Sequence, residues 1–387
     1  MSGLAARLDD GLDALDRDGL RRQRRVLDAR RGARVEIGGR ILLDFASNDY
    51  LGLARHPALA AAAHAAIDEL GVGAGASPLV TGHQHIHQRA EERFAAFSGL
   101  PRALLFASGY AANLGILTSF CDRHAEIFAD RLNHACLVDG ARLSRATFTR
   151  YPHLDLAALA KQLEASRAAV KVVATDSVFS MDGDLADVRE LLALCERHDA
   201  WLVLDDAHGI GVLGATGRGA LEHFGLRSPR ILYMATLGKA LGGYGAFAAG
   251  APEAIEWLVQ RARTYIYSTA LPPAVPAAAI AALDVVDAQP ALVATLRERI
   301  AEFRAASAAI GLELTGSMTA IQPLLLGDAA PAVEASRRLL EQGFVVPAIR
   351  PPTVPDGTSR LRVSLSAAHS REDVERLAHA LAAAVAS

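Results

Sequence analysis

From about residue 100 onward, short apolar segments alternate with stretches that have the length and pattern of helices. The apolar segments are residues 102–106, 170–174, 201–204, 231–235 and 246–249. The helical stretches between them are long enough for the crossover connections that parallel strands require. The alternation therefore predicts an α/β domain built on a largely parallel sheet.

The pattern changes on either side of this region. Residues 1–25 mix spaced leucines with acids and arginines, which predicts an amphipathic arm helix rather than a signal or transit peptide. After Pro273 a long alanine-rich helical region leads to further strands and a last helix, as is typical of a smaller α+β domain. These predicted elements are strands at residues 320–326, 344–349 and 361–365 and a helix from Arg371.

These patterns divide the 387 residues into an N-terminal arm (1–50), a large domain (51–275) and a C-terminal small domain (276–387). The net charge is −3 with both signs scattered, which predicts no nucleic-acid partner and no membrane-binding surface. The chain has 3 cysteines, which lie far apart and form no CxxC pair. They predict reduced core thiols in a cytoplasmic protein.

A single lysine follows the apolar segment 231–235, within Thr236-Leu237-Gly238-Lys239. Glycines around it let a ligand approach the backbone closely. A lysine among apolar neighbours loses solvation, so that its neutral, nucleophilic amine becomes easier to reach. The segment is therefore a candidate for a Schiff-base lysine, and a surface lysine in a glycine-rich loop is the alternative. A P-loop is not indicated, because Tyr233 occupies the place of its first glycine and Ala240 that of its hydroxyl residue.

A second candidate site follows the apolar segment 201–204, as Asp205-Asp206-Ala207-His208-Gly209. Open α/β sheets bind ligands at the carboxyl ends of their strands. An acid placed there is costly unless it meets a positive group, and a cofactor nitrogen that must stay protonated would be such a group.

The next residues, Gly209-Ile210-Gly211-Val212-Leu213-Gly214, match the dinucleotide fingerprint Gly-x-Gly-x-x-Gly. Further glycines follow instead of a clean helix, and residues 226–245 contain no acid to bind a ribose. A nucleotide-dependent oxidoreductase therefore remains only as an alternative of a different class.

Two further segments begin helical stretches. Ser108-Gly109-Tyr110 follows a predicted strand, so its free backbone N–H groups could bind a phosphate, although an ordinary serine cap has the same sequence. Asn133-His134 has the pattern of a capping pair. The cluster His83, His85 and His87 is expected to bind no metal, because no cysteine lies nearby and only His83 and His87 share a helix face.

In the C-terminal domain, Arg360 and Arg362 point to the same side of a predicted strand. One of them could bind a substrate carboxylate through its guanidinium. Solvent-exposed arginines are the alternative, which we favour for Arg360.

Together these residues resemble the α-oxoamine synthases, a branch of the fold-type I pyridoxal phosphate (PLP) enzymes. The resemblance covers nearly the whole chain and rests on Asp205-Asp206-Ala207-His208-Gly209, Thr236-Leu237-Gly238-Lys239, Ser47-Asn48-Asp49-Tyr50-Leu51-Gly52-Leu53 and Phe179-Ser180-Met181-Asp182-Gly183-Asp184. It implies an α/β fold of the fold-type I transferases, in which a large domain with a mostly parallel sheet is joined to a smaller α+β C-terminal domain. Residues 266–273 and 349–355 look like the member that serves biotin biosynthesis.

The resemblance implies catalytic roles for four residues. Lys239 would bind PLP as a Schiff base, and Asp205 would pair with the pyridinium nitrogen. His208 would bond to the ring hydroxyl, and His134 would stack on the ring face, where it would also meet the substrate. The cofactor is thus expected to be PLP, with no metal.

The resemblance also implies how the rest of the cofactor would be bound. Its phosphate would lie against Gly109, Tyr110 and Thr236, with Ser180 nearby. Thr269 would reach the phosphate from a partner subunit, which implies a homodimer.

For the substrates, the resemblance implies that Asn48 and Arg362 bind the amino acid carboxylate, with Arg21 and Thr353 on the acyl side. The reaction would be a decarboxylative condensation of L-alanine with pimeloyl-CoA or a pimeloyl-carrier protein. A sibling enzyme that joins glycine to a short acyl-CoA, in the manner of 2-amino-3-ketobutyrate ligase, is an alternative. A catalytically silent partner subunit is a further one, although Lys239, Asp205 and His208 are all present.

Overall fold

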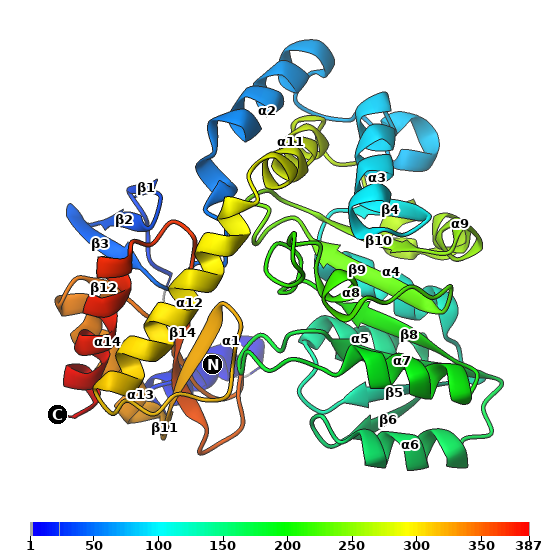
Figure 1. The fold of residues 1–387 in the computed structure, drawn as a ribbon. Coiled ribbons are helices and arrows are strands. Elements are labelled where there is room, and N and C mark those ends of the chain that lie inside the picture. Colours follow the sequence, from blue (N-terminus) through cyan, green and yellow to red (C-terminus); the bar gives the residue numbers. More distant parts are fainter. Residues whose placement is uncertain (1–2, 23, 387) are drawn as a thin grey trace. The chain divides into compact units, whose positions relative to one another are not determined.

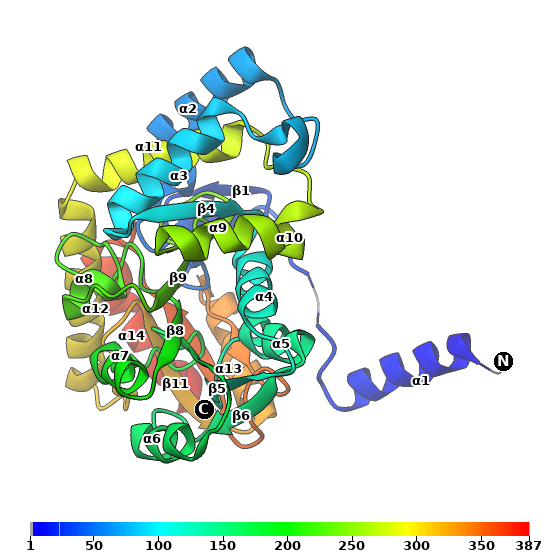
Figure 2. The same cartoon turned by 90° about the vertical axis from the view of Figure 1, so that its right-hand side faces the viewer.

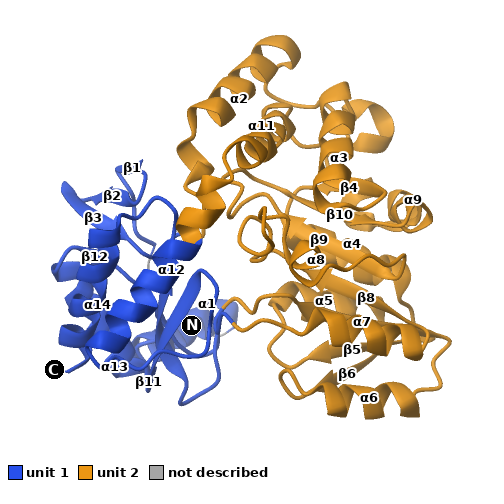
Figure 3. Cartoon of the chain, viewed as in Figure 1, with its two compact units in different colours: residues 1–47, 181–183, 297–387 blue, residues 48–180, 184–296 orange. Residues whose placement is uncertain are grey.

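The computed structural model describes residues 3–22 and 24–386. The chain forms two compact units, which Figure 3 colours separately. The smaller unit comprises residues 1–47, 181–183 and 297–387, and the larger one comprises residues 48–180 and 184–296. The N-terminal residues and a short segment from the middle of the chain thus group with the C-terminal region. The limits predicted for the arm and the two domains stay predictions.

A 7-stranded sheet forms the centre of the larger unit (Figure 1). Across the sheet, the strands are β4 (Arg102–Phe106), β10 (Ala246–Gly250), β9 (Ile231–Thr236), β8 (Ala200–Asp205), β7 (Val170–Asp176), β5 (Ala125–Asp130) and β6 (Thr147–Tyr151). Strands β9, β8, β7, β5 and β6 pair in parallel, whereas β10 is antiparallel to both of its neighbours. Strand β4 therefore runs in the same direction as β9. The prediction of a largely parallel sheet is confirmed.

Strands β5 and β6 are absent from the predicted apolar segments. Edge strand β6 reads Thr-Phe-Thr-Arg-Tyr, and only Tyr151 in it is buried. Strand β5 carries Glu126, which accepts hydrogen bonds from Thr149 and Ser166. Polar residues that find partners at a sheet edge weaken the apolar pattern by which strands are predicted from sequence.

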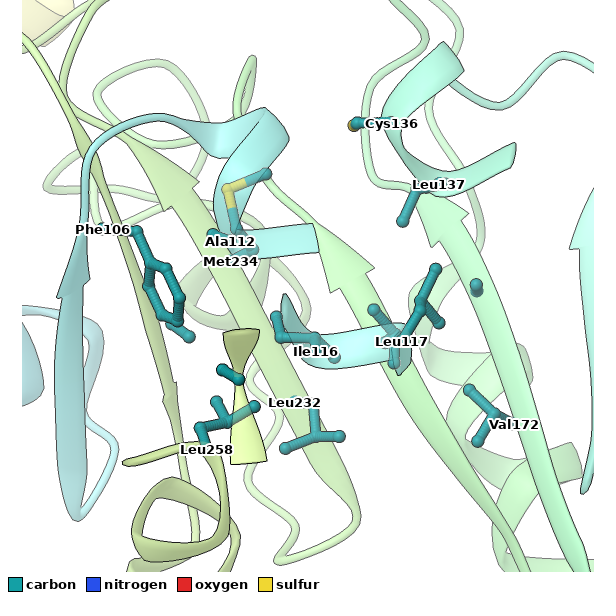
Figure 4. Close-up of a cluster of buried hydrophobic side chains, with 14 of the residues drawn as sticks. Phe106, Ala112, Ile116, Leu117, Cys136, Leu137, Val172, Leu232, Met234 and Leu258 are labelled. Atoms are coloured by element: carbon teal, nitrogen blue, oxygen red, sulfur yellow. The ribbon is translucent and has the colours of Figure 1, made fainter. Parts of the chain in front are cut away.

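The helices of the larger unit lie around the sheet, but the first and the last of them pack on each other rather than on it. They are α2 (Pro57–Leu70), α3 (His85–Ser98), α4 (Gly109–Phe120), α5 (Ala135–Ser144), α6 (Leu156–Ala165), α7 (Val188–Arg197), α8 (Ala220–Phe224), α9 (Pro252–Arg261), α10 (Arg263–Ile266) and α11 (Ala274–Ala288), with short helical turns at Leu53–Arg55 and Pro78–Gly82. Figure 2 shows α4 and α7 on opposite sides of β8. On the α4 side, alternate strand residues such as Leu232 and Val172 pack with Ile116, Leu117 and Leu258 in one buried cluster (Figure 4).

The smaller unit contains two sheets, ordered β1-β2-β3-β12 and β11-β14-β13. Its elements are α1 (Leu4–Arg17), β1 (Ala29–Arg31), β2 (Arg34–Ile37), β3 (Arg40–Asp44), β11 (Ile321–Gly327), α13 (Ala329–Glu341), β12 (Phe344–Val345), β13 (Ala348–Ile349), β14 (Ser359–Ser364), α14 (Arg371–Val385) and most of α12 (Ala291–Ala309), whose first residues belong to the larger unit. The strand predicted at residues 344–349 is divided, because β12 pairs with β3 and β13 pairs with β14. Pro347 lies between them, where it cannot donate to a ladder.

Within residues 3–22 and 24–386, no single helix is long and apolar enough to cross a membrane. Helices α11 and α12 reach that length and apolar content only as a pair, and the pair is sharply bent at its break.

Candidate active site

The predicted catalytic residues of the larger unit meet at one edge of its sheet. Asp205 is the last residue of β8, and Thr236 is the last residue of β9. Ser108 and Gly109 follow β4, which runs in the same direction. This edge is therefore the carboxyl end of these strands, where open α/β sheets bind ligands.

A chain of hydrogen bonds starts at Lys239. Its Nζ lies 2.8 Å from Nε2 of His208, and Nδ1 of His208 lies 2.7 Å from the hydroxyl of Tyr50. That hydroxyl donates to Oδ1 of Asn48 at 3.1 Å. Because the Tyr50 hydroxyl donates to Asn48, it accepts from His208, so Nδ1 carries the imidazole proton and Nε2 accepts from Lys239. The imidazole of His208 thus holds the amine of the half-buried Lys239 in place, and Tyr50 fixes the orientation of that imidazole.

Asp205 is buried and fixed through both carboxylate oxygens. Its Oδ1 accepts from the backbone N–H of Ala207 at 2.9 Å, and its Oδ2 accepts from Nδ2 of Asn113 at 2.7 Å. The side chain is 4% exposed. The two N–H donors thus fix the orientation of this carboxylate, as an acid that pairs with a protonated cofactor nitrogen would require.

The neighbouring Asp206 serves the protein itself. It accepts from the hydroxyls of Ser177 and Tyr233 and from the backbone N–H of Ala220. Burial raises its pKa to about 6 in spite of these three bonds. Asp206 therefore fixes the loop that follows β8 rather than facing a ligand.

His134 caps α5, as its sequence predicts. Its backbone N–H donates to Asp176 at 2.8 Å, and its Nδ1 lies 2.8 Å from Sγ of Cys136. Desolvation lowers the pKa of His134, and the charge of Lys239 adds to this while Asp205 opposes it. The pKa of Asp176 is raised by burial and by the charge of Asp205. His134 therefore lies in the electrostatic field of the two main catalytic candidates.

The predicted phosphate-binding residues surround the start of α4. Ser108 caps the helix by accepting from the N–H of Ala111 at 3.1 Å. The N–H groups of Gly109 and Tyr110 belong to the first helical turn, so no carbonyl of the same helix can accept from them. A side chain at position 109 would crowd Met234, because an added Cβ would lie 3.3 Å from Cε of Met234. Thr236 donates to the carbonyl of Gly245 at 3.1 Å, which fixes its hydroxyl at the end of β9.

Three further residues of the larger unit lie in loops or on exposed surfaces. Tyr110 is exposed, and its hydroxyl bonds to the carboxylate of Asp139, which raises the pKa of Tyr110. Ser180 is half-buried in the loop after β7, and Thr269 is exposed after α10. Their roles toward a cofactor stay predictions.

The smaller unit brings the predicted acyl-side residues together. Nη2 of Arg22 donates to the hydroxyl of Thr353 at 3.1 Å, and Nη2 of Arg350 donates to the carbonyl of Arg21 at 3.2 Å. Arg362 is buried, and its Nη1 donates to Ser364 at 2.8 Å. The roles of Arg21, Thr353 and Arg362 toward a substrate stay predictions.

The expectation that Arg360 is solvent-exposed is wrong. Arg360 is 3% exposed, and it donates to the carboxylate of Asp182 and, at 3.2 Å, to the carbonyl of Met181. A half-buried acid partner from a distant part of the chain cannot be read from the local alternation of a strand.

The segment that matches a dinucleotide fingerprint, residues 209–214, forms backbone hydrogen bonds with residues of its own loop. The N–H of Gly209 donates to the carbonyl of Asp206, and the N–H of Gly211 donates to the carbonyl of Gly217. A Cβ on Gly209 would lie 1.8 Å from Oδ1 of Asp206, and one on Gly211 would lie 2.4 Å from Cβ of Ala240. These glycines are needed for packing, and their N–H groups are already bonded within the loop.

The histidine cluster has structural partners. His87 caps α3 by accepting from the N–H of Gln84 at 3.1 Å, and its Nε2 bonds to the carbonyl of Leu271 at 2.8 Å. His83 lies 3.3 Å from Gln88. Among residues 3–22 and 24–386, no group of three or more His, Cys, Asp or Glu is arranged to bind a metal ion.

Four residues of this edge were not predicted to belong to the site: Tyr50, Asn113, Cys136 and Asp176. Each contacts a predicted residue, through the bonds described above. Tyr50 lies within residues 47–53, one of the segments that carry the family resemblance, so the sequence could have indicated it. The other three are single residues inside helices or at a strand end, where nothing local distinguishes them from core or capping residues.

The sheet order and the fixed lysine, acid and histidine at its edge define a transferase of fold type I. The family model for aminotransferase class I and II matches residues 40–381. An 8-amino-7-oxononanoate synthase from Methylobacillus flagellatus is 58% identical over 93% of this chain and 91% of its own length. One from Methylococcus capsulatus is 53% identical over 94% of each chain.

Solved structures agree with this assignment. A serine palmitoyltransferase from Sphingomonas wittichii has a TM-score of 0.93 at 31% identity and covers 99% of this chain and 98% of its own. An 8-amino-7-oxononanoate synthase from Francisella tularensis has a TM-score of 0.78 at 31% identity, covering 89% of this chain and 98% of its own. The chain belongs to the aminotransferase class I and II family and groups there with its 8-amino-7-oxononanoate synthase relatives. The predicted fold-type I architecture, the resemblance and the prediction of an enzyme are confirmed.

Proposed function

We propose that this enzyme condenses L-alanine with a pimeloyl thioester, in biotin biosynthesis, to give 8-amino-7-oxononanoate, carbon dioxide and the free thiol carrier. The observation that carries the proposal is the contact between Lys239 and His208 beside the buried, doubly bonded Asp205. The names of relatives that are 52–58% identical supply the particular product.

The residues at the sheet edge fit PLP. Asp205 offers a desolvated carboxylate whose position is fixed by Ala207 and Asn113, as a pyridinium nitrogen would need. Gly109 and Tyr110 offer first-turn N–H groups for the phosphate, and Thr236 offers a hydroxyl. A neighbouring structure, of SPT with PLP, has a TM-score of 0.94 to this chain at 27% identity. When bound, PLP would supply an electron sink that stabilises negative charge on the α-carbon of alanine.

The chain's own residues would then move the protons. The amine of Lys239 would accept the α-proton of alanine and later return a proton to the product. His208 would keep that amine in place, because its Nδ1 proton is bonded to Tyr50 and its Nε2 faces Lys239. Asn48, the last group in this chain of bonds, would bind the carboxylate of alanine.

The net chemistry is a replacement at the thioester carbon. A bond forms between the α-carbon of alanine and the thioester carbonyl carbon, and the thiolate leaves and takes up a proton. The carboxylate of alanine is then lost as carbon dioxide, and a proton takes its place on the α-carbon. In the smaller unit, Arg21, Thr353 and Arg362 are the residues we assign to substrate binding.

We further propose that the enzyme is a cytoplasmic homodimer. Thr269 is exposed near the exposed side chain of Tyr267, where it could reach the phosphate site of a second copy. The three cysteines are buried and unpaired, as expected of a reducing compartment.

Release of free thiol tests this proposal. The PLP-loaded enzyme would be given L-alanine or glycine with pimeloyl-, acetyl-, succinyl- or palmitoyl-CoA. Release confined to alanine and pimeloyl-CoA is expected. Release with glycine and a short acyl-CoA would show the sibling activity instead. Release with no pair would contradict the proposal for CoA substrates, and a pimeloyl-carrier protein would then be assayed in the same way.

A further inference from the structure

A short hairpin, residues 177–186, connects β7 to α7 and carries Ser180. Its two arms are joined by the N–H of Phe179, which donates to the carbonyl of Asp184 at 3.0 Å, and by the N–H of Ala186, which donates to the carbonyl of Ser177 at 2.9 Å. The hairpin begins beside the candidate site, because the N–H of Ser177 donates to the carbonyl of Asp205 at 2.8 Å. Its position therefore sets where Ser180 lies.

His153, in the segment that follows β6, joins this hairpin to the sheet. Its Nδ1 lies 2.9 Å from Oδ1 of Asp130, and its Nε2 lies 3.0 Å from Oδ2 of Asp184. Its ring also meets the ring of Phe179 edge-on, with centroids 4.5 Å apart. One ring thus contacts both arms of the hairpin and a strand end.

Both imidazole nitrogens face carboxylate oxygens, which can only accept while they are ionised. Each nitrogen must therefore carry a proton, so the ring is an imidazolium. Desolvation opposes this charge, but the bonds and charges of Asp130 and Asp184 outweigh it and raise the pKa of His153 to about 9. The bridge is charged at neutral pH.

Asp130 is a firm anchor for this bridge. It is 1% exposed at the end of β5 and accepts from the N–H groups of Leu132 and Leu154, both at 2.8 Å. Asp184 is the more exposed partner, since its side chain is 33% exposed, and it lies in the hairpin itself. The tip of the hairpin, residues 181–183, groups with the smaller unit, where Ser317 donates to the carbonyl of Gly183 at 3.1 Å. The bridge therefore fixes the part of the hairpin that belongs to the larger unit.

We propose that His153 is a positioning residue of the cofactor site: by joining Asp130 at the end of β5 to Asp184 in the 177–186 hairpin, it keeps Ser180 in place for PLP binding. The resemblance implies the role of Ser180 near the phosphate, and PLP is the cofactor of the proposed function, so this inference rests on the proposed function in that respect. The bridge itself does not depend on any ligand.

The test compares four variants with the wild-type protein. His153→Asn removes the ring, and Asp184→Asn removes the charge on the hairpin while leaving the bond between His153 and Asp130. The double variant closes a mutant cycle. His223→Asn is the matched control, because His223 also meets a phenylalanine edge-on, with centroids 4.8 Å apart, but lies on α8.

Two readouts are taken from each protein. Hydrogen exchange in the peptide that spans residues 177–186 reports the hairpin without cofactor or substrate. Titration of the cofactor-free protein with PLP, followed by equilibrium dialysis, reports the dissociation constant without turnover. In His153→Asn and in Asp184→Asn we expect exchange in this peptide to be about tenfold faster and PLP binding to be about tenfold weaker.

The double variant is expected to show no more than the larger single effect, because both substitutions break the same bridge. The control should match wild type in both readouts. Unchanged exchange in His153→Asn, or additive effects in the double variant, would overturn the bridge. Faster exchange with unchanged PLP affinity would overturn the positioning role. A wild-type protein that binds no PLP at all would overturn the proposed function. In that case the exchange result would still decide whether the bridge holds the hairpin.

Discussion

Two adjacent carboxylates at the end of β8, Asp205 and Asp206, show how differently one strand end can be used. Successive residues of a strand point to opposite sides. Asp205 lies with His134, Cys136 and the catalytic lysine candidate, whereas Asp206 is enclosed by Ser177, Tyr233 and the N–H of Ala220. Both acids are buried, so burial does not separate a catalytic acid from a structural one. The partners separate them. Those of Asp206 join it to the hairpin after β7, to β9 and to the start of α8, and those of Asp205 leave it among groups that could meet a ligand.

The largest effect is expected from Asp205→Asn. Loss of the charge that would pair with the cofactor nitrogen should lower turnover about 10²-fold or more. The fold should survive, because the amide of Asn113 can turn and offer its buried Oδ1, which has no partner among the described residues, to the new side chain. Turnover in the thiol-release assay and the melting temperature would be measured together. Turnover close to wild type would remove Asp205 from the catalytic group.

The Asp206 side should respond to Gly219→Ala through stability instead. Gly219 has φ +87°, and a Cβ there would lie 2.1 Å from Oδ2 of Asp206 and 2.8 Å from the hydroxyl of Tyr233. Backbone strain and overpacking together should lower the free energy of unfolding by about 3–4 kcal/mol. Gly225→Ala is the control, since Gly225 has φ +66° but no atom within 4 Å of its added Cβ. Denaturant unfolding that shows equal losses in the two variants would mean that Asp206 does not fix this loop.

The pH dependence of stability gives a separate test of Asp206. The pKa of Asp206 is raised from 3.8 to about 6, so the folded protein takes up its proton more readily than the unfolded chain. Protonation of Asp206 therefore contributes to the free energy of unfolding. This contribution is fully present below about pH 4 and is lost as the pH rises through about 6. Asp206→Asn cannot titrate, so the difference in unfolding free energy between variant and wild type should change by about 2–3 kcal/mol over this range. A constant difference from pH 4 to 7 would show that Asp206 stays ionised throughout.

The smallest effect is expected from Tyr50→Phe. The variant loses the hydroxyl that joins His208 to Asn48, but the ring that packs in the core remains. Turnover should fall about tenfold, as for the loss of one hydrogen bond, with little change in melting temperature. Steady-state kinetics would detect this. A loss as large as that of Asp205→Asn would mean that Tyr50 takes part in proton transfer itself.

The sequence predicts those parts of the site that follow apolar strands. Asp205 comes directly after such a segment, and Lys239 comes after one with Thr236, Leu237 and Gly238 between. The parallel sheet brings the two strand ends together, as β8 and β9 pair directly. Asn113 and Cys136 could not be found in this way. They reach Asp205 from two helices, and helical periodicity gives no sign of a side chain that bonds to a particular acid.

Other differences arise where tertiary pairing overrides local pattern. The strand predicted at residues 344–349 is divided between two sheets, because each half pairs with a different strand. Arg360 is buried because Asp182, far away in sequence, supplies its partner. The bridge of His153 to Asp130 and Asp184 has the same origin, since three separate loops and strand ends supply its members.

The central claim is that Lys239 is the residue that binds PLP, and reduction with borohydride tests it most directly. The chain has three lysines, Lys161, Lys171 and Lys239, so peptide mapping of the PLP-loaded, reduced protein can distinguish all of them. Lys171 donates to the carbonyl of His198 at 3.1 Å at the opposite end of β7 and serves as an internal control. We expect the label on the peptide that contains Lys239 and no label in Lys239→Ala. A label on Lys161 or Lys171, or a label that persists in Lys239→Ala, would contradict the account.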